Sequence, residues 1–319
     1  MTRTATALFA SAAFFAAGTL ASGSAEAAPD VVVSIKPIHS LVASIMKGIS
    51  EPELILNGAG SPHTYQMTPA DAETLQNADV VFWVGPELEK FLEKPIESLS
   101  SDATVVELED APELVKLPMR EGGTFEAHDD GDEGHAHEGE YHAHHDHEET
   151  DAHIWLNTGN AKALSRAIAE AMSEADPANA PRYNANLIAL DRELDALSTE
   201  LKAKVAPVKD RPIVVFHDAY QYFEKEAGIR VAGSITISPE TLPGAARISE
   251  IHDKLKTLGA SCVFAEPQFE PKLVNVVIEG TSAKTGTLDP EAATLTPGPN
   301  LYFELMRGIA GSITTCLSE

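Results

Sequence analysis

Short apolar runs alternate with stretches of helical periodicity along most of the chain. The runs cover residues 31–35, 54–56, 79–84, 104–108, 212–216, 229–237 and 262–265. We expect each run to form a buried strand, because near-continuous apolar runs between helical segments are typical of parallel α/β sheets. The runs fall into two groups of similar weight, which predicts two α/β lobes with parallel sheets.

The longest helical pattern lies between the two groups, over residues 180–204. Its apolar face consists of leucines spaced three and four apart, namely Leu187, Leu190, Leu194, Leu197 and Leu201. A coiled-coil dimer is one interpretation of this stripe, but barely two heptads favour a helix packed against its own domains. We therefore predict a first lobe at 29–178, a rigid linker helix at 179–206 and a second lobe at 207–319.

The first 28 residues have the composition of a secretory signal peptide. Arg3 precedes an uncharged run over residues 5–20, and mostly small residues follow through Ala28. The run is short for a membrane span, and no later stretch approaches the roughly 20 apolar residues that a membrane helix needs. The sequence thus predicts a chain that is exported by a cleavable signal peptide and is not stably inserted in a membrane.

Charge and cysteine content restrict the chemistry of such a chain. Its net charge is −26, whereas nucleic acids and anionic membrane surfaces need a positive footprint on their partner. Cations suit this protein better as ligands.

Cys262 and Cys316 are the only cysteines, and an isolated pair in an exported protein predicts one disulfide. Metal binding by the two thiolates is the less favoured alternative.

Residues 121–151 form a segment of abruptly different composition. They contain seven histidines and twelve acidic residues but no lysine or arginine, so we predict a disordered loop that contributes to no packed core. The histidines are His128, His135, His137, His142, His144, His145 and His147. Imidazoles and carboxylates together bind Zn²⁺, Ni²⁺ or Cu²⁺ in many arrangements, which favours accessory metal capture. A solvated linker with incidental metal affinity is the alternative.

Three other histidines occupy positions typical of a specific site. His63 follows a glycine-rich turn, His153 begins an apolar run, and His217 ends a predicted strand. Ligands of open α/β sheets gather beyond the carboxyl ends of the strands, which is where His217 is expected. Three imidazoles from separate loops would suit zinc, although their spacing alone does not establish that they converge. His39 and His252 lie within helical patterns and are assigned no role.

At these residues the chain resembles the ZnuA-type solute-binding proteins of bacterial zinc ABC importers. The resemblance covers essentially the whole chain after the predicted signal peptide, including the His/acidic insertion. The matching motifs are GAGSPHTY at 58–65, LQNADVVFWVGP at 75–86, DAHIWLN at 151–157, FHDAYQYFE at 216–224, FAEPQF at 264–269 and GTLDP at 286–290. The family more often has proline where Ala152 stands, a difference that retains the histidine beside it.

The resemblance implies two α/β lobes joined by a long helix, with the metal bound in the cleft between the lobes. It also implies that His63, His153 and His217 bind Zn(II), with a fourth position near Asp289 that binds directly or through water. Manganese-binding relatives have a carboxylate at the position of His217, so the imidazole there favours zinc. Glu266 is a candidate for a carboxylate that hydrogen-bonds to a metal-binding histidine without binding the metal itself.

Together these observations predict a binding protein rather than an enzyme. We expect it to capture periplasmic Zn(II) with high affinity and deliver it to the permease of a zinc ABC transporter, as a monomer that does not bind nucleic acid. Two alternatives stay open. The histidine-rich loop could act alone as a periplasmic zinc buffer, or three histidines and a water could form a zinc hydrolase site. A hydrolase would also need a general base, for which Glu266 is the only obvious candidate.

Overall fold

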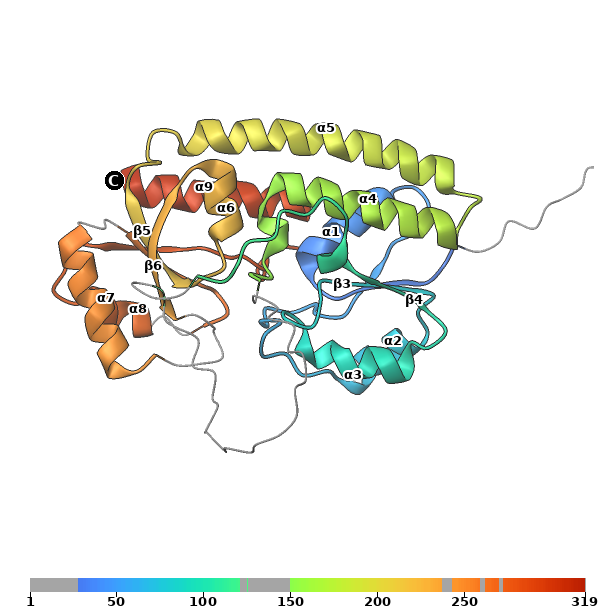
Figure 1. Ribbon diagram of the computed structural model, residues 1–319, viewed down its shortest axis with the longest axis horizontal. Coiled ribbons are helices and arrows are strands. Elements are labelled where there is room, and N and C mark those ends of the chain that lie inside the picture. The colour runs from blue at the N-terminus through green and yellow to red at the C-terminus, as the bar shows by residue number, and fades with distance from the viewer. Residues whose placement is uncertain are drawn as a thin grey trace, which may run out of the picture.

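Two four-stranded parallel sheets form the framework of the protein (Figure 1). The computed structural model describes residues 28–120, 125, 150–236, 243–258, 262–269 and 272–318. Nearly all of the predicted signal peptide and all seven histidines of the predicted loop lie outside the described residues. The prediction of two α/β lobes with parallel sheets is confirmed, and each of the seven apolar runs overlaps a strand.

The first sheet has the strand order β2-β1-β3-β4. Its strands are β1 (Val31–Val33), β2 (Glu53–Leu54), β3 (Val80–Trp83) and β4 (Thr104–Glu107). The helices around it are α1 (Lys36–Ile45), α2 (Pro69–Gln76), α3 (Lys90–Leu99) and α4 (Thr158–Ala175). Helices α1 and α4 cover one face of the sheet while α2 and α3 cover the other, so its central strands β1 and β3 are buried on both sides. Their continuous apolar sequences follow from this double cover.

The second sheet has the order β6-β5-β7-β8. Its strands are β5 (Pro212–His217), β6 (Arg230–Thr236), β7 (Cys262–Ala265) and β8 (Lys284–Thr287). The helices around it are α6 (Gln221–Ala227), α7 (Ala245–Leu258), α8 (Lys272–Ile278) and α9 (Leu301–Ser318). Strand β8 is a largely exposed edge strand, and none of the seven apolar runs covers it.

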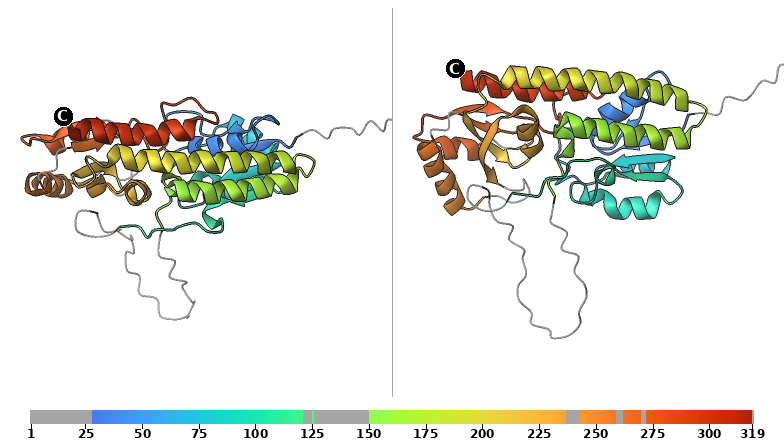
Figure 2. Two further views of the ribbon diagram at one scale, coloured as in Figure 1. Left: turned by 90° about the horizontal axis from the view of Figure 1, so that it is seen from above. Right: turned by 45° about the horizontal axis from the view of Figure 1, so that its top comes forward.

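The leucine-striped helix is α5 (Ala180–Val205), and it extends along both lobes (Figures 1 and 2). It packs against α1 and α4 near the first sheet and against α6 and α9 near the second. Leu190, Leu194, Leu197 and Leu201 are at most 3% exposed and belong to one apolar core that also contains residues of both sheets. The leucine stripe is therefore covered by other helices of the same chain.

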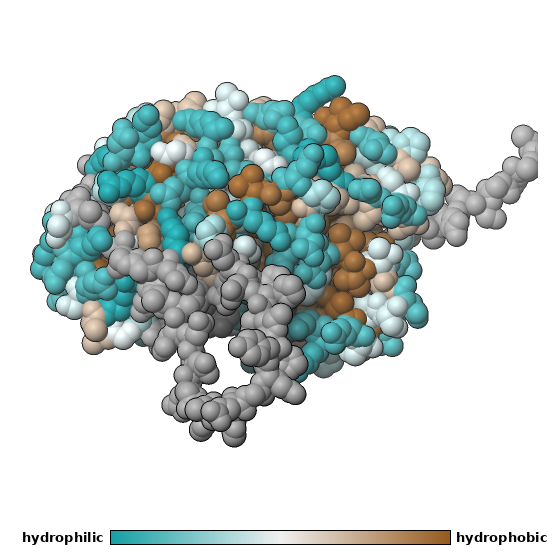
Figure 3. All heavy atoms as spheres, in the orientation of Figure 1, coloured by the Kyte–Doolittle hydropathy of each residue, from teal (hydrophilic) through white to brown (hydrophobic). Residues whose placement is uncertain are grey.

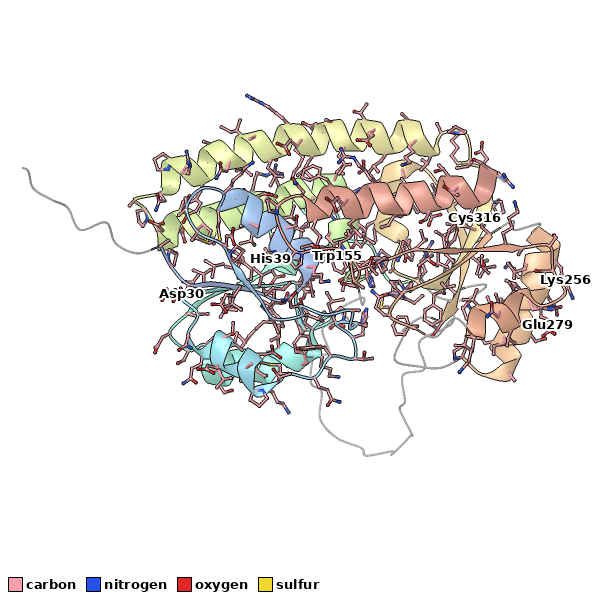
Figure 4. The ribbon with its side chains drawn as sticks, turned by 180° about the vertical axis from the view of Figure 1, so that it is seen from behind. Asp30, His39, Trp155, Lys256, Glu279 and Cys316 are labelled. Carbon is pink, nitrogen blue, oxygen red and sulfur yellow. A yellow bond between two sulfur atoms is a disulfide. The ribbon has the colours of Figure 1, made fainter. Side chains whose placement is uncertain are left out.

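Cys262 of β7 and Cys316 of α9 form a disulfide, which confirms the predicted pairing. Their Cα atoms are 6.2 Å apart, and both residues are buried. Cys316 lies near the carboxyl end of α9 (Figure 4). The bond therefore fastens the last helix to an inner strand of the second sheet.

One face of the protein is mainly polar. Figure 3 shows hydrophilic side chains over most of the face turned to the viewer, with apolar residues scattered among them. Among the described helices, none combines the length and the apolar content of a bilayer span.

Candidate metal centre

The structure brings His63, His153 and His217 together from three separate segments. One nitrogen from each ring lies within 4.8 Å of the other two. The Nε2 atom of His153 is 3.4 Å from Nε2 of His63 and 3.2 Å from Nε2 of His217. His153 and His217 are about 5% and 3% exposed, and His63 is partly exposed. Three imidazole nitrogens thus converge at a site that is closed on most sides.

Each histidine is positioned by its local sequence. His217 is the last residue of β5, so the end of a buried apolar strand carries it to the edge of the sheet. His153 immediately precedes a buried 3-10 turn, η2 (Ile154–Leu156), whose Trp155 is tied down at both ends. The indole of Trp155, which is labelled in Figure 4, donates to Pro290 O at 2.9 Å, and the backbone carbonyl of Trp155 accepts from the Tyr302 hydroxyl at 2.7 Å. His63 lies in the loop between β2 and α2.

Carboxylates contact the Nδ1 atoms of two of the three imidazoles, whose Nε2 atoms face the centre of the cluster. The Nδ1 atom of His217 is 2.8 Å from both carboxylate oxygens of Glu266, and Nδ1 of His153 is 2.7 Å from Asp151 Oδ1. A carboxylate accepts a hydrogen bond from Nδ1–H, and this tautomer of the neutral ring leaves the Nε2 lone pair free. In the neutral rings of His153 and His217, the two Nε2 lone pairs then face each other, which is the arrangement a cation would complete.

Sequence reasoning proposed Glu266 for this role but overlooked Asp151. Glu266 is 3% exposed and also accepts a hydrogen bond from the Tyr220 hydroxyl at 3.3 Å. Asp151 is equally buried, and its Oδ1 additionally accepts the backbone N–H of His153 at 3.0 Å. The available signal was an acidic residue two positions before the histidine in the DAHIWLN motif.

Asp289 lies outside this group of three. Its Oδ1 accepts from the backbone N–H of Ala293 at 3.0 Å and from Gln268 Nε2 at 3.3 Å, and its Oδ2 accepts from the backbone N–H of Thr294 at 3.3 Å. In this arrangement the carboxylate caps the turn that follows β8. Its place as the fourth ligand stays a prediction.

The two histidines that were assigned no role make ordinary structural contacts. His39 Nε2 is 3.0 Å from Pro52 O, and His252 Nε2 is 2.8 Å from Glu279 O. Both pairs join neighbouring elements of a single lobe, and His39 and Glu279 lie far apart in Figure 4.

Burial and charge shift the pKa values of two of the clustered histidines in opposite directions. Burial, with a further contribution from His153 and His217, lowers the pKa of His63 well below its ordinary value. Burial also lowers the pKa of His217, but the charge of Glu266 and its hydrogen bond outweigh that effect and leave the pKa raised. His63 is therefore neutral at pH 7, whereas His217 is the more readily protonated of the two.

Comparisons with known proteins find similar chains over nearly the whole length of this one. A family model described as ZnuA, zinc-uptake complex component A, periplasmic, matches residues 31–316. The high-affinity zinc uptake system protein ZnuA of Brucella suis biovar 1 (strain 1330) is 51% identical over 97% of this chain and 97% of its own length. ZnuA of Yersinia pestis is 35% identical over 90% of this chain and 91% of its own.

A solved structure shows the same fold at greater sequence distance. The periplasmic zinc binding protein TroA from Treponema pallidum superposes with a TM-score of 0.75 and 21% identity, over 91% of this chain and 99% of that one.

Proposed function

The chain belongs to the ZnuA family of periplasmic zinc-uptake components, and from this membership we propose that it captures Zn²⁺ with His63, His153 and His217. It is the zinc-binding component of an uptake system and not an enzyme. Such a component hands its cargo to a membrane permease. We propose that it does so from the periplasm, as a monomer, after a signal peptide at residues 1–28 has been removed.

The observation that carries this proposal is the convergence of three imidazoles backed by two carboxylates. Nitrogen-rich sites favour zinc over the harder cations calcium, magnesium and manganese, which prefer oxygen ligands. Asp151 and Glu266 fix the ring orientations and supply negative charge next to the cation. Water or Asp289 supplies the fourth position in our proposal.

The first lobe contributes two of the three histidines of the proposed site, and the second lobe contributes one. His63 and His153 come from the segments that we assign to the first lobe at 29–178, and His217 and Glu266 from the second lobe at 207–319. The linker helix at 179–206 holds the lobes at a fixed separation. The histidine-rich segment at 121–151 serves as an accessory in this proposal, and neither the buffer nor the hydrolase alternative is favoured by the family.

Removal of the histidine-rich segment is expected to leave the tight zinc site intact. Residues 122–149 would be replaced by a short Gly/Ser linker, and zinc would be titrated by calorimetry into the full chain and the shortened one. Both should show one tight site, because none of its histidines belongs to the segment. Only the full chain should show additional weak sites. Loss of the tight site on shortening would instead favour a buffer that acts through the segment alone.

Zinc affinity is expected to fall as the pH falls through the raised pKa of His217. Below that pKa the metal must displace a proton from His217, and above it the imidazole is already neutral. One displaced proton weakens binding roughly tenfold for each pH unit below the pKa. Calorimetric titrations in buffers of different ionisation enthalpy would count the released protons. A constant affinity between pH 5 and 8 would contradict this expectation.

A further inference from the structure

Arg120 makes the most extensive charged contact next to the metal centre, although no motif pointed to it. Its Nε donates to Asp218 Oδ2 at 2.9 Å and its Nη2 to Asp218 Oδ1, so the guanidinium grips the carboxylate at two points. Its Nη1 donates to Glu224 Oε2 at 2.7 Å. The ring of Phe125 lies 4.0 Å from the guanidinium carbon. The head group of Arg120 is thus held in one orientation by two carboxylates and a ring.

The contact with Asp218 links Arg120 to His217. Asp218 directly follows His217, and its side chain is only 6% exposed. A buried carboxylate without a partner is strongly unfavourable, so Arg120 allows Asp218 to remain charged in this position. Glu224 also accepts the backbone N–H of Val231 at 3.0 Å, which fixes Arg120 to β6 as well as to α6.

The backbone segment just before Arg120 links it to His153. Arg120 lies two residues beyond Pro118, which pairs with Thr150 in an antiparallel bridge. Next to this bridge, the backbone N–H of Asp151 donates to Leu117 O at 2.9 Å. Asp151 in turn holds the Nδ1 atom of His153. A displacement of residues 117–120 would therefore shift Asp151 and rotate the ring that it orients.

We propose that Arg120 is a positioning residue for the zinc site. It fixes the position of the segment that precedes His153 relative to the turn that follows His217. The two imidazoles are thereby held at the separation that zinc requires. The role needs arginine rather than lysine, because only the planar fork binds Asp218 at two points and Glu224 at the same time. This inference rests on the proposed binding of zinc by the three histidines.

The test compares R120Q with R307Q. Arg307 makes a similar two-point contact with Glu200, but it joins α9 to α5 and has no link to the metal centre. Zinc affinity would be measured by competition with a chelator, and ligand geometry by the visible absorption of the Co²⁺-loaded protein. R120Q should bind zinc about 10- to 100-fold more weakly and show an altered Co²⁺ spectrum, as expected for loss of an outer contact to a ligand. R307Q should match the wild type in both.

A double-mutant cycle separates positioning from general destabilisation. D218N removes the same contact from the other side, so R120Q/D218N should bind zinc no more weakly than the weaker single variant. R120K, which keeps the charge without the fork, should recover only part of the affinity. Additive losses for R120Q and D218N, or a wild-type Co²⁺ spectrum in R120Q, would overturn the inference. Failure of the wild type itself to bind zinc would instead refute the proposed function.

Discussion

Replacement of His217 by alanine is expected to abolish tight one-to-one zinc binding. The change removes one of three nitrogen ligands and deprives the buried Glu266 of its contacts with His217. The loss should exceed the 10- to 100-fold that removal of an outer contact costs, because a direct ligand is lost. His63→Ala and His153→Ala should have effects of the same order. Competition titrations against a chelator of known zinc affinity would measure them.

The matched control is His252→Ala. His252 is a partly exposed histidine whose Nε2 contacts Glu279 O in the second lobe, away from the cluster. This variant should bind zinc as tightly as the wild type. If any of the three clustered histidines could be replaced with as little effect as His252, the assignment of that residue as a ligand would be wrong.

Removal of the disulfide is expected to cost on the order of 4 kcal/mol in the free energy of unfolding. The bond closes a loop of 54 residues, and the restriction that it places on the unfolded chain gives this figure as an upper estimate. Urea unfolding of C262A/C316A would be compared with unfolding of the oxidised wild type. Wild-type protein kept in a reducing agent is the matched control, because it lacks the bond but retains both side chains.

Zinc binding should survive in that double variant under native conditions. Cys262 begins β7, whereas Glu266 directly follows the opposite end of that strand. The disulfide therefore supports the second lobe without touching the ligands. A stability difference below about 1 kcal/mol would show that packing of α9 alone holds the end of the chain, since buried α9 residues such as Met306 and Ile313 contribute independently.

Much of the fold follows from the periodicity of the sequence. Buried parallel strands such as β3 consist almost wholly of apolar residues, and the leucine stripe of α5 has a strict helical spacing. Strand β8 has neither feature, because an exposed edge strand is defined by its backbone pairing with β7 and not by burial of its side chains. An apolar pattern alone therefore underestimates the width of the second sheet.

The site was predictable only in part. The three histidines could be selected by their positions relative to strands and turns, but their convergence depends on contacts between segments 64 and 90 residues apart. Arg120 acts through hydrogen bonds to Asp218 and Glu224, which lie 98 and 104 positions further along the chain, so no local spacing gives a signal for it. Asp151 lies only two positions before His153, and that local signal was overlooked. The hydrogen bonds by which Asp289 caps the turn after β8 depend on the backbone conformation of that turn, which the sequence pattern does not predict.

The hydroxyl of Tyr222 has a consequence for how this protein can change over evolution. It accepts the backbone N–H of Leu117 and donates to the carbonyl of Asp151, so a single side chain joins both ends of the intervening segment to α6. Because these ends are fastened next to each other, we expect a change in chain length within residues 126–149 to leave His153 in place.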